Sequence, residues 1–163
     1  MPIVHDWLAR RASLAPERTA LIDSLRGDRS ISWREWNSSA NRTARFLHDV
    51  LGVRRGDRVA VLAMNCTEYL DLLFACAKLG AILQPLNWRL SPPELAALLH
   101  DAEPSVLILG PDFQSQLDAV RSDLPKSLRH ILPLEDSPAR RPEDTLFSAR
   151  EALSDAPLSP VDV

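Results

Sequence analysis

The stretch RVAVLAMNCTEYLDLLFACAKLGAILQPL, residues 58–86, decides the fold. Residues 58–63 are apolar on both faces at their centre, as in a parallel strand that helices cover from both sides. Residues 68–79 are apolar almost all round, which predicts a largely buried helix. Gly80 is a typical helix stop, and residues 81–86 have the pattern of a second strand. This order predicts a right-handed crossover within a parallel sheet.

The same alternation continues toward the C-terminus. Ser91 and Glu94 match a capping box with proline at the first helical position, which predicts a helix over 94–101. The residues that follow predict a strand, a helix and a last short strand, at 105–109, 113–124 and 128–132. The predicted fold class is α/β, with an open, mainly parallel, doubly wound sheet flanked by helices.

The N-terminal side predicts a helix and a small hairpin before the sheet begins. Apolar residues at helical spacing suggest a short amphipathic helix over 4–15, which Pro16 interrupts. Residues 19–23 and 30–33 have strand character, and the turn at 26–29 joins them into a hairpin.

A long amphipathic helix is expected after the hairpin. Ser32 and Glu35 match a second capping box, which marks the start of the helix. Its apolar face continues to Leu51, and Gly52 is the expected left-handed stop.

The length of 163 residues fits one domain with a sizeable core. We expect residues 1–132 to form the α/β unit. Residues 133–163 are rich in proline and acidic side chains, so we expect a linker there with one short helix at 145–153.

Composition excludes several classes of protein. The net charge is −3, and residues 1–58 hold 11 Arg and 7 acidic residues without a basic stripe interleaved with aromatics, so we expect no nucleic-acid binding. No apolar run reaches membrane-spanning length, and the start lacks a secretory signal, so we expect a cytoplasmic protein without a transmembrane segment. Five scattered glycines match no phosphate-binding loop.

The histidines and cysteines give no catalytic or metal-binding pattern. The four histidines lack paired spacing, and we expect structural roles for them; they are His5, His48, His100 and His130. Cys66 falls at a strand-to-helix junction without a neighbouring base, and Cys76 falls inside the apolar helix. We therefore expect no metal site and no catalytic cysteine.

The loop after the second strand is the best candidate for ligand contact. Asn87, Trp88 and Arg89 follow the carboxyl end of a parallel strand, the edge at which open α/β sheets place ligands. Arg89 could clamp a phosphate or carboxylate with two hydrogen bonds. The alternative is a loop-stabilising arginine stacked on Trp88.

Four segments together resemble the acyl-adenylate-forming, AMP-binding ligase superfamily, in particular its fatty-acyl-CoA and aryl-CoA ligases. They are PERTALI (16–22), ISWREW (31–36), GDRVA (56–60) and CAKLGAILQPLNWRL (76–90). Their order and spacing are similar to those of the family, with Trp88 at a position where many relatives have proline.

The resemblance implies an enzyme that uses ATP, Mg²⁺ and coenzyme A to convert a fatty or aryl carboxylic acid into its acyl-CoA through an acyl-adenylate. It also implies that Arg89 lies near the nucleotide of coenzyme A and meets its phosphate. Family members are several times longer, and their phosphate-binding loop and C-terminal domain lie downstream of such a linker. We therefore expect this chain to be an N-terminal portion, inactive alone, with no catalytic residue of its own and no tightly bound cofactor.

Two other functions stay open at this stage. The chain could be a non-catalytic module that binds a partner or forms a homodimer through an exposed apolar surface. An independent nucleotide-binding domain is disfavoured by the missing phosphate loop.

Overall fold

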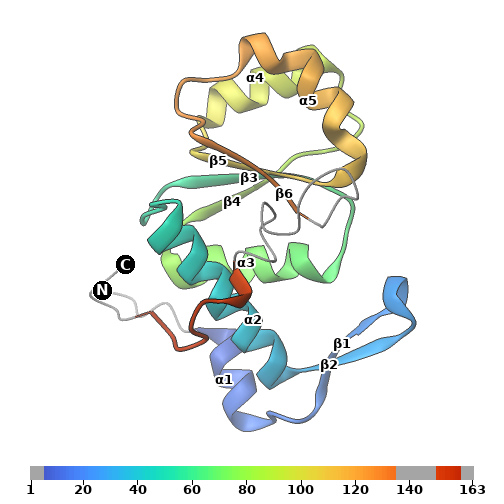
Figure 1. Ribbon diagram of the computed structural model, residues 1–163, viewed down its shortest axis with the longest axis vertical. Coiled ribbons are helices and arrows are strands. Elements are labelled where there is room, and N and C mark those ends of the chain that lie inside the picture. Colours follow the sequence, from blue (N-terminus) through green and yellow to red (C-terminus); the bar gives the residue numbers. More distant parts are fainter. Residues whose placement is uncertain (1–5, 135–149, 159–163) are drawn as a thin grey trace.

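A four-stranded parallel sheet forms the centre of the computed structural model, which describes residues 6–134 and 150–158 (Figure 1). The strand order is β4-β3-β5-β6. The bounds are β3 Arg58–Leu62, β4 Ile82–Pro85, β5 Val106–Leu109 and β6 His130–Pro133. In register, Val59 lies opposite Leu83 on one side and Val106 on the other. The predicted fold class is confirmed.

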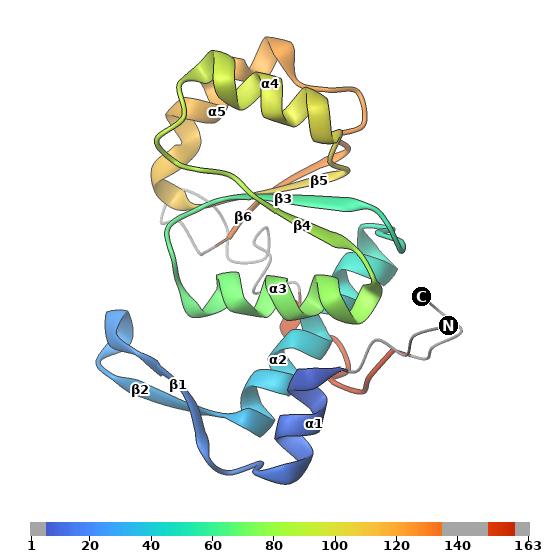
Figure 2. The same cartoon turned by 180° about the vertical axis from the view of Figure 1, so that it is seen from behind.

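Helices cover both faces of this sheet (Figures 1 and 2). Helices α2 (Trp33–Arg45) and α3 (Thr67–Leu79) lie on one face, and α4 (Pro92–Ala102) and α5 (Gln114–Val120) lie on the other. The strand residues alternate between two cores. Val59 and Val61 pack with α3 in one, whereas Ala60 and Leu62 pack with α4 and α5 in the other. This period of two explains why β3 is apolar throughout.

The strand order reverses once along the chain. From β3 the chain crosses to β4 on one side, and then returns past β3 to β5 on the other side. The reversal makes the carboxyl ends of β3 and β5 the topological switch point of the sheet.

A smaller layer packs below α2 and α3. It consists of α1 (Trp7–Leu14) and the antiparallel hairpin of β1 (Thr19–Asp23) and β2 (Arg29–Ser32). A third apolar cluster joins it to the rest, and the Trp36 and Phe74 rings meet edge to face there with centroids 4.9 Å apart. Lys78 of α3 also pairs with Asp6, whose carboxylate caps α1. The predicted hairpin is confirmed.

Helix α2 begins as the sequence predicts and ends differently. The Ser32 hydroxyl accepts from the Glu35 N–H at 3.2 Å, and the Glu35 carboxylate accepts from the Ser32 N–H at 2.7 Å. Residues Phe46–Val50 then form a π-helical turn instead of continuing the α-helix to Leu51. Gly52 follows with φ of +68°, in the left-handed conformation expected of a helix stop.

Several predicted elements begin or end at other residues in the structure, and three examples follow. The first helix begins at Trp7, and residues 4 and 5 of its predicted range lie outside the described residues. The predicted helix 113–124 is a short α5 with 3-10 turns at Pro111–Phe113 and Arg121–Asp123. The last strand lies at His130–Pro133 instead of 128–132, since its register is set by pairing with β5.

Residues 150–158 pack against α2 and α3. Arg150 is buried, and its guanidinium donates to Asp71 of α3 at 2.8 Å and to the Thr43 hydroxyl of α2. Asn41 donates to the Asp155 carbonyl at 2.7 Å. Of the predicted helix at 145–153, only Arg150 and Glu151 are described as helical, and residues 145–149 lie outside the described part. The boundary at 132 stays a prediction.

The capping box of α2 gives a first prediction. Ser32→Ala removes the acceptor for the Glu35 N–H, so the free energy of unfolding should fall by about 1 kcal/mol. Urea denaturation measures this loss. Ser32→Asp restores a side-chain acceptor and should recover most of the stability. Equal destabilisation by both variants would contradict the capping role.

The buried ion pair between α3 and residue 150 gives a second prediction. Arg150→Met leaves the Asp71 carboxylate buried without its cation, which should cost roughly 3–5 kcal/mol of unfolding free energy. The double variant with Asp71→Leu should recover much of that loss. Arg121→Met breaks an exposed ion pair with Asp118 and is the matched control, with little expected change. An unchanged urea midpoint for Arg150→Met would contradict the role of the pair.

Candidate functional site

Three loops follow the carboxyl ends of β3, β4 and β5, where a parallel sheet of this kind places its ligands. At the switch point the loops after β3 and β5 are in direct contact. A Cβ on Gly110 would lie 3.1 Å from the Cα of Ala63, a tight contact that a larger residue could make only if the neighbouring loop moved by a few tenths of an ångström. The Gly110 N–H also donates to the Leu62 carbonyl at 2.8 Å. The loops after β3 and β5 therefore pack against each other here, where related sheets can bind a phosphate.

The loop after β4 holds the arginine singled out from the sequence. The Arg89 guanidinium lies 4.1 Å from the centroid of the Trp88 ring, so the predicted stacking alternative is present. The Arg89 backbone N–H donates to Asn87 Oδ1 at 3.0 Å. From α5, the Gln116 side-chain amide donates to the Trp88 carbonyl at 2.8 Å. The loop is thus held by its own turn and by a neighbouring helix.

Stacking does not consume the hydrogen-bond donors of Arg89. Its side chain is exposed, and no carboxylate within residues 6–134 or 150–158 forms an ion pair with it. A guanidinium carries five N–H donors in its plane, and a ring covers only its face. The two readings of Arg89 are therefore compatible: the arginine stabilises the loop and can still bind an anion.

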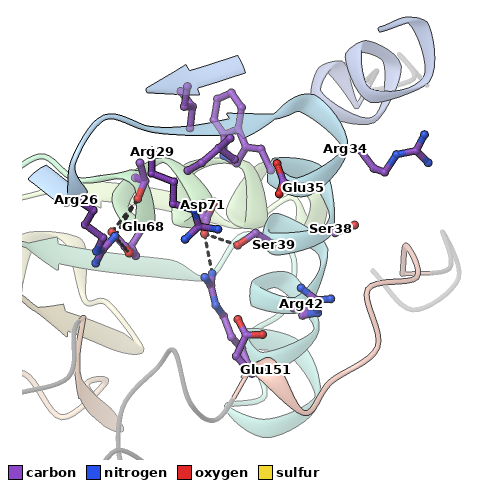
Figure 3. Close-up of a pocket in the computed structure, with 15 residues that line it drawn as sticks. Arg26, Arg29, Arg34, Glu35, Ser38, Ser39, Arg42, Glu68, Asp71 and Glu151 are labelled. Atoms are coloured by element: carbon purple, nitrogen blue, oxygen red, sulfur yellow. Dashed lines mark hydrogen bonds and ion pairs between the residues drawn. The ribbon is translucent and has the colours of Figure 1, made fainter. Parts of the chain in front are cut away.

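A cavity of about 500 Å³ opens between the hairpin, α2, α3 and residues 150–151 (Figure 3). Its floor includes Glu68 and Asp71, two acidic side chains that are buried although the sequence suggested an almost wholly apolar helix. Sequence reasoning missed this site. The available signal was the pair of acids three residues apart in the first turns of α3, which places both on one face of the helix.

The two buried acids of this cavity are each paired with an arginine. Arg26 pairs with Glu68 and, at 3.1 Å, with Asp23. Asp71 accepts from Arg150 and from the Ser39 hydroxyl, the latter at 2.6 Å, and Figure 3 shows both contacts meeting at its carboxylate. Burial raises the pKa of the Asp71 carboxyl above its usual range, while Arg150 and Ser39 oppose that rise. Because the two buried acids are already paired, we interpret these contacts as structural: they hold the hairpin, α2, α3 and residue 150 together.

The histidines and cysteines take separate places in the structure. His48 contacts Asp49 at 2.7 Å and His100 contacts Asp123 at 3.0 Å, both through ring nitrogens, while His5 lies outside the described residues. Cys66 is the N-cap residue of α3. Cys76 is buried in the core, and this burial raises the pKa of its thiol to about 12.

Within residues 6–134 and 150–158, no three His, Cys, Asp or Glu side chains gather in a way suited to a metal ion. Over the same residues, no helix is long and apolar enough to cross a membrane.

Curated relatives of the chain are CoA ligases. It is 42% identical over 121 residues to indoleacetate–CoA ligase of Aromatoleum aromaticum, a match that covers 74% of this chain and 23% of the ligase. It is 35% identical over 149 residues to crotonobetaine/carnitine–CoA ligase of Salmonella paratyphi A, covering 90% of this chain and 29% of that one. The chain therefore spans about a quarter of the length of these relatives.

Solved structures agree with the sequence relatives. The N-terminal domain of FACL13 from Mycobacterium tuberculosis superposes with a TM-score of 0.84 at 30% identity, covering 98% of this chain and 38% of that domain. The anthranilate CoA ligase AuaEII superposes with a TM-score of 0.72 at 32% identity, covering 82% of this chain and 25% of the ligase.

The family model for AMP-binding enzymes matches residues 8–162, nearly the whole sequence. This match confirms the resemblance drawn from the four sequence motifs. The chain belongs to the AMP-binding enzyme family.

Proposed function

We propose that this chain is the N-terminal portion of an AMP-forming acyl-CoA synthetase. The complete enzyme would convert a carboxylic acid, ATP and coenzyme A into acyl-CoA, AMP and pyrophosphate. The carboxylate oxygen first attacks the α-phosphorus of ATP and releases pyrophosphate. The thiol of coenzyme A then attacks the acyl carbon and releases AMP. One observation carries the proposal: 98% of the chain superposes on the N-terminal domain of FACL13.

The names of the relatives suggest the substrate class. They include ligases of indoleacetate, of crotonobetaine or carnitine, and of long-chain fatty acids. All of these substrates are carboxylic acids, and they include an aryl acid and long-chain fatty acids. We therefore propose a fatty or aryl carboxylic acid as the substrate of the complete enzyme.

The residues of the chain fit coenzyme A better than they fit ATP and Mg²⁺. The exposed guanidinium of Arg89 suits a phosphate of coenzyme A, because a planar fork of N–H donors matches phosphate oxygens. In contrast, Glu68 and Asp71 already bind arginine, and the sequence has no glycine-rich loop for the phosphates of ATP. We derive no step of adenylation from the described residues and propose that the chain alone is inactive.

A pyrophosphate-release assay tests the inactivity of the chain alone. With ATP, Mg²⁺ and a panel of fatty and aryl acids, the 163-residue chain should release no pyrophosphate above a protein-free control. The electrostatic groups that stabilise the adenylation transition state are missing from it. A longer protein that contains the chain should release pyrophosphate with at least one acid. Carboxylate-dependent release by the chain alone would overturn the proposal.

Substitution of Arg89 tests the coenzyme A contact in such a longer enzyme. Arg89→Ala should raise the KM for coenzyme A roughly tenfold, the effect of losing about 1.4 kcal/mol of a charge-assisted hydrogen bond. Adenylation, measured as ATP–pyrophosphate exchange, should not change. Arg121→Ala removes another exposed arginine, which pairs with Asp118, and should leave both values unaltered. An unchanged KM for Arg89→Ala would remove Arg89 from the site.

The alternative function is a non-catalytic interaction module. Size-exclusion chromatography with light scattering separates it from the main proposal. A stable homodimer together with full inactivity of any longer protein would favour the interaction module.

A further inference from the structure

We propose that Trp88 and Gln116 are positioning residues that hold the Arg89 guanidinium ready for the 3′-phosphate of coenzyme A. The inference rests on the proposed function, because it takes coenzyme A as the ligand. It goes further by naming the residues that prepare this arginine. Neither residue touches the ligand in this scheme.

Trp88 acts on the orientation of the guanidinium. The 4.1 Å between Arg89 Cζ and the ring centroid places the cation on the indole face, where the ring quadrupole attracts it. This contact restricts the positions that the guanidinium can take, and no carboxylate of the described residues forms an ion pair with it. An unstacked, exposed arginine has several rotatable bonds, and ordering it on binding costs conformational entropy. Stacking removes part of this cost before the ligand arrives.

Gln116 acts on the position of the loop. It is the only described side chain outside residues 86–91 that donates a hydrogen bond to this loop's backbone, to the Trp88 carbonyl at 2.8 Å. Gln116 lies on α5, which is anchored in the core: Phe113, before Gln116, and Leu117, after it, are both buried between the sheet, α4 and α5. The contact therefore couples the exposed loop to the core.

Asn87 completes the arrangement from within the loop. Its Oδ1 accepts from the Arg89 N–H, and its carbonyl accepts from the Leu90 N–H at 3.1 Å. These bonds form a turn that side chains of asparagine commonly stabilise. The turn holds the backbone position of Arg89, and the Gln116 hydrogen bond holds that of Trp88. The contact with the Trp88 ring then restricts the position of the guanidinium.

The 3′-phosphate is the part of coenzyme A that this arrangement suits best. It is a monoester with up to two negative charges and three terminal oxygens, so two N–H donors of one guanidinium can bind it side by side. Each phosphorus of the diphosphate bridge carries only one charge and two terminal oxygens. A single exposed arginine without a second cation is better matched to the monoester.

Nuclear magnetic resonance of the 163-residue chain tests the positioning directly. The ring current of Trp88 should shift the side-chain signals of Arg89 upfield, and Trp88→Leu should abolish the shift. Gln116→Ala should reduce it, since the loop loses its anchor. Gln114→Ala is the matched control: the Gln114 amide lies on the same helix and binds Asp118 instead of the loop. An unchanged Arg89 signal in Gln116→Ala would overturn the role of Gln116.

Titration with coenzyme A and with 3′-dephospho-coenzyme A supplies the functional readout. The wild-type chain should bind coenzyme A roughly tenfold more tightly, as expected for one charge-assisted contact of about 1.4 kcal/mol. Arg89→Ala should lower this ratio to about one, whereas Gln114→Ala should keep it. Trp88→Leu and Gln116→Ala should each reduce the ratio to about one third of the wild-type value while Arg89 is still present.

The outcomes separate the two proposals. A wild-type chain that does not distinguish the two ligands removes Arg89 from the phosphate site, and the positioning scheme falls with it. A ratio that Arg89→Ala abolishes but Trp88→Leu and Gln116→Ala leave intact overturns the positioning roles alone. A merely structural role would lower thermal stability without changing the ratio, so that result also counts against the inference.

Discussion

The rest of the structure depends on the burial of β3 on both of its faces. Each residue from Val59 to Leu62 is almost fully buried, and alternate side chains enter opposite cores. Both edges of the strand are also paired, with β4 and β5. A strand in this position needs a helical layer above and below it, because an uncovered face would expose a row of valine or leucine side chains. The double winding of the chain around β3 follows from this constraint.

Helix α3 is buried on two sides, because it packs against both the sheet and the N-terminal layer. One side of it packs on the sheet through Leu72 and Leu79, and another side contacts the third cluster through Leu70 and Phe74. A helix buried on two sides has to be apolar nearly all round. Its acidic first turns are tolerated only because Arg26 and Arg150, from distant parts of the sequence, neutralise Glu68 and Asp71.

The elements that sequence predicts well are those fixed by local chemistry. The capping box at Ser32 and the left-handed glycines 52 and 80 depend on neighbours within a few residues, and the structure contains them where expected. The π-helical turn at Phe46–Val50 buries Phe46 and Leu47, and its local sequence pattern looks like that of an ordinary helix. Periodicity cannot distinguish the two conformations.

In the candidate site, too, contacts between sequence neighbours could be predicted, whereas contacts between distant residues could not. Arg89 and Trp88 are adjacent in sequence, and their stacking was among the alternatives that their order suggests. Gln116 and Arg150 act across 28 and 79 residues of chain, respectively, and no spacing rule connects them to Trp88 or Asp71. Such contacts depend on the folded arrangement of helices around the sheet, which only the tertiary structure supplies.

The five glycines of the chain all have structural positions of their own. Four of them, at positions 27, 52, 56 and 80, have positive φ and form turns or helix ends. The fifth, Gly110, lets two loops touch at the switch point of the sheet. Each glycine thus has a structural task, and none is left to bring backbone N–H groups close to a phosphate. At this edge of the sheet, the exposed guanidinium of Arg89 is therefore a candidate anion-binding group, and its orientation matters for that role.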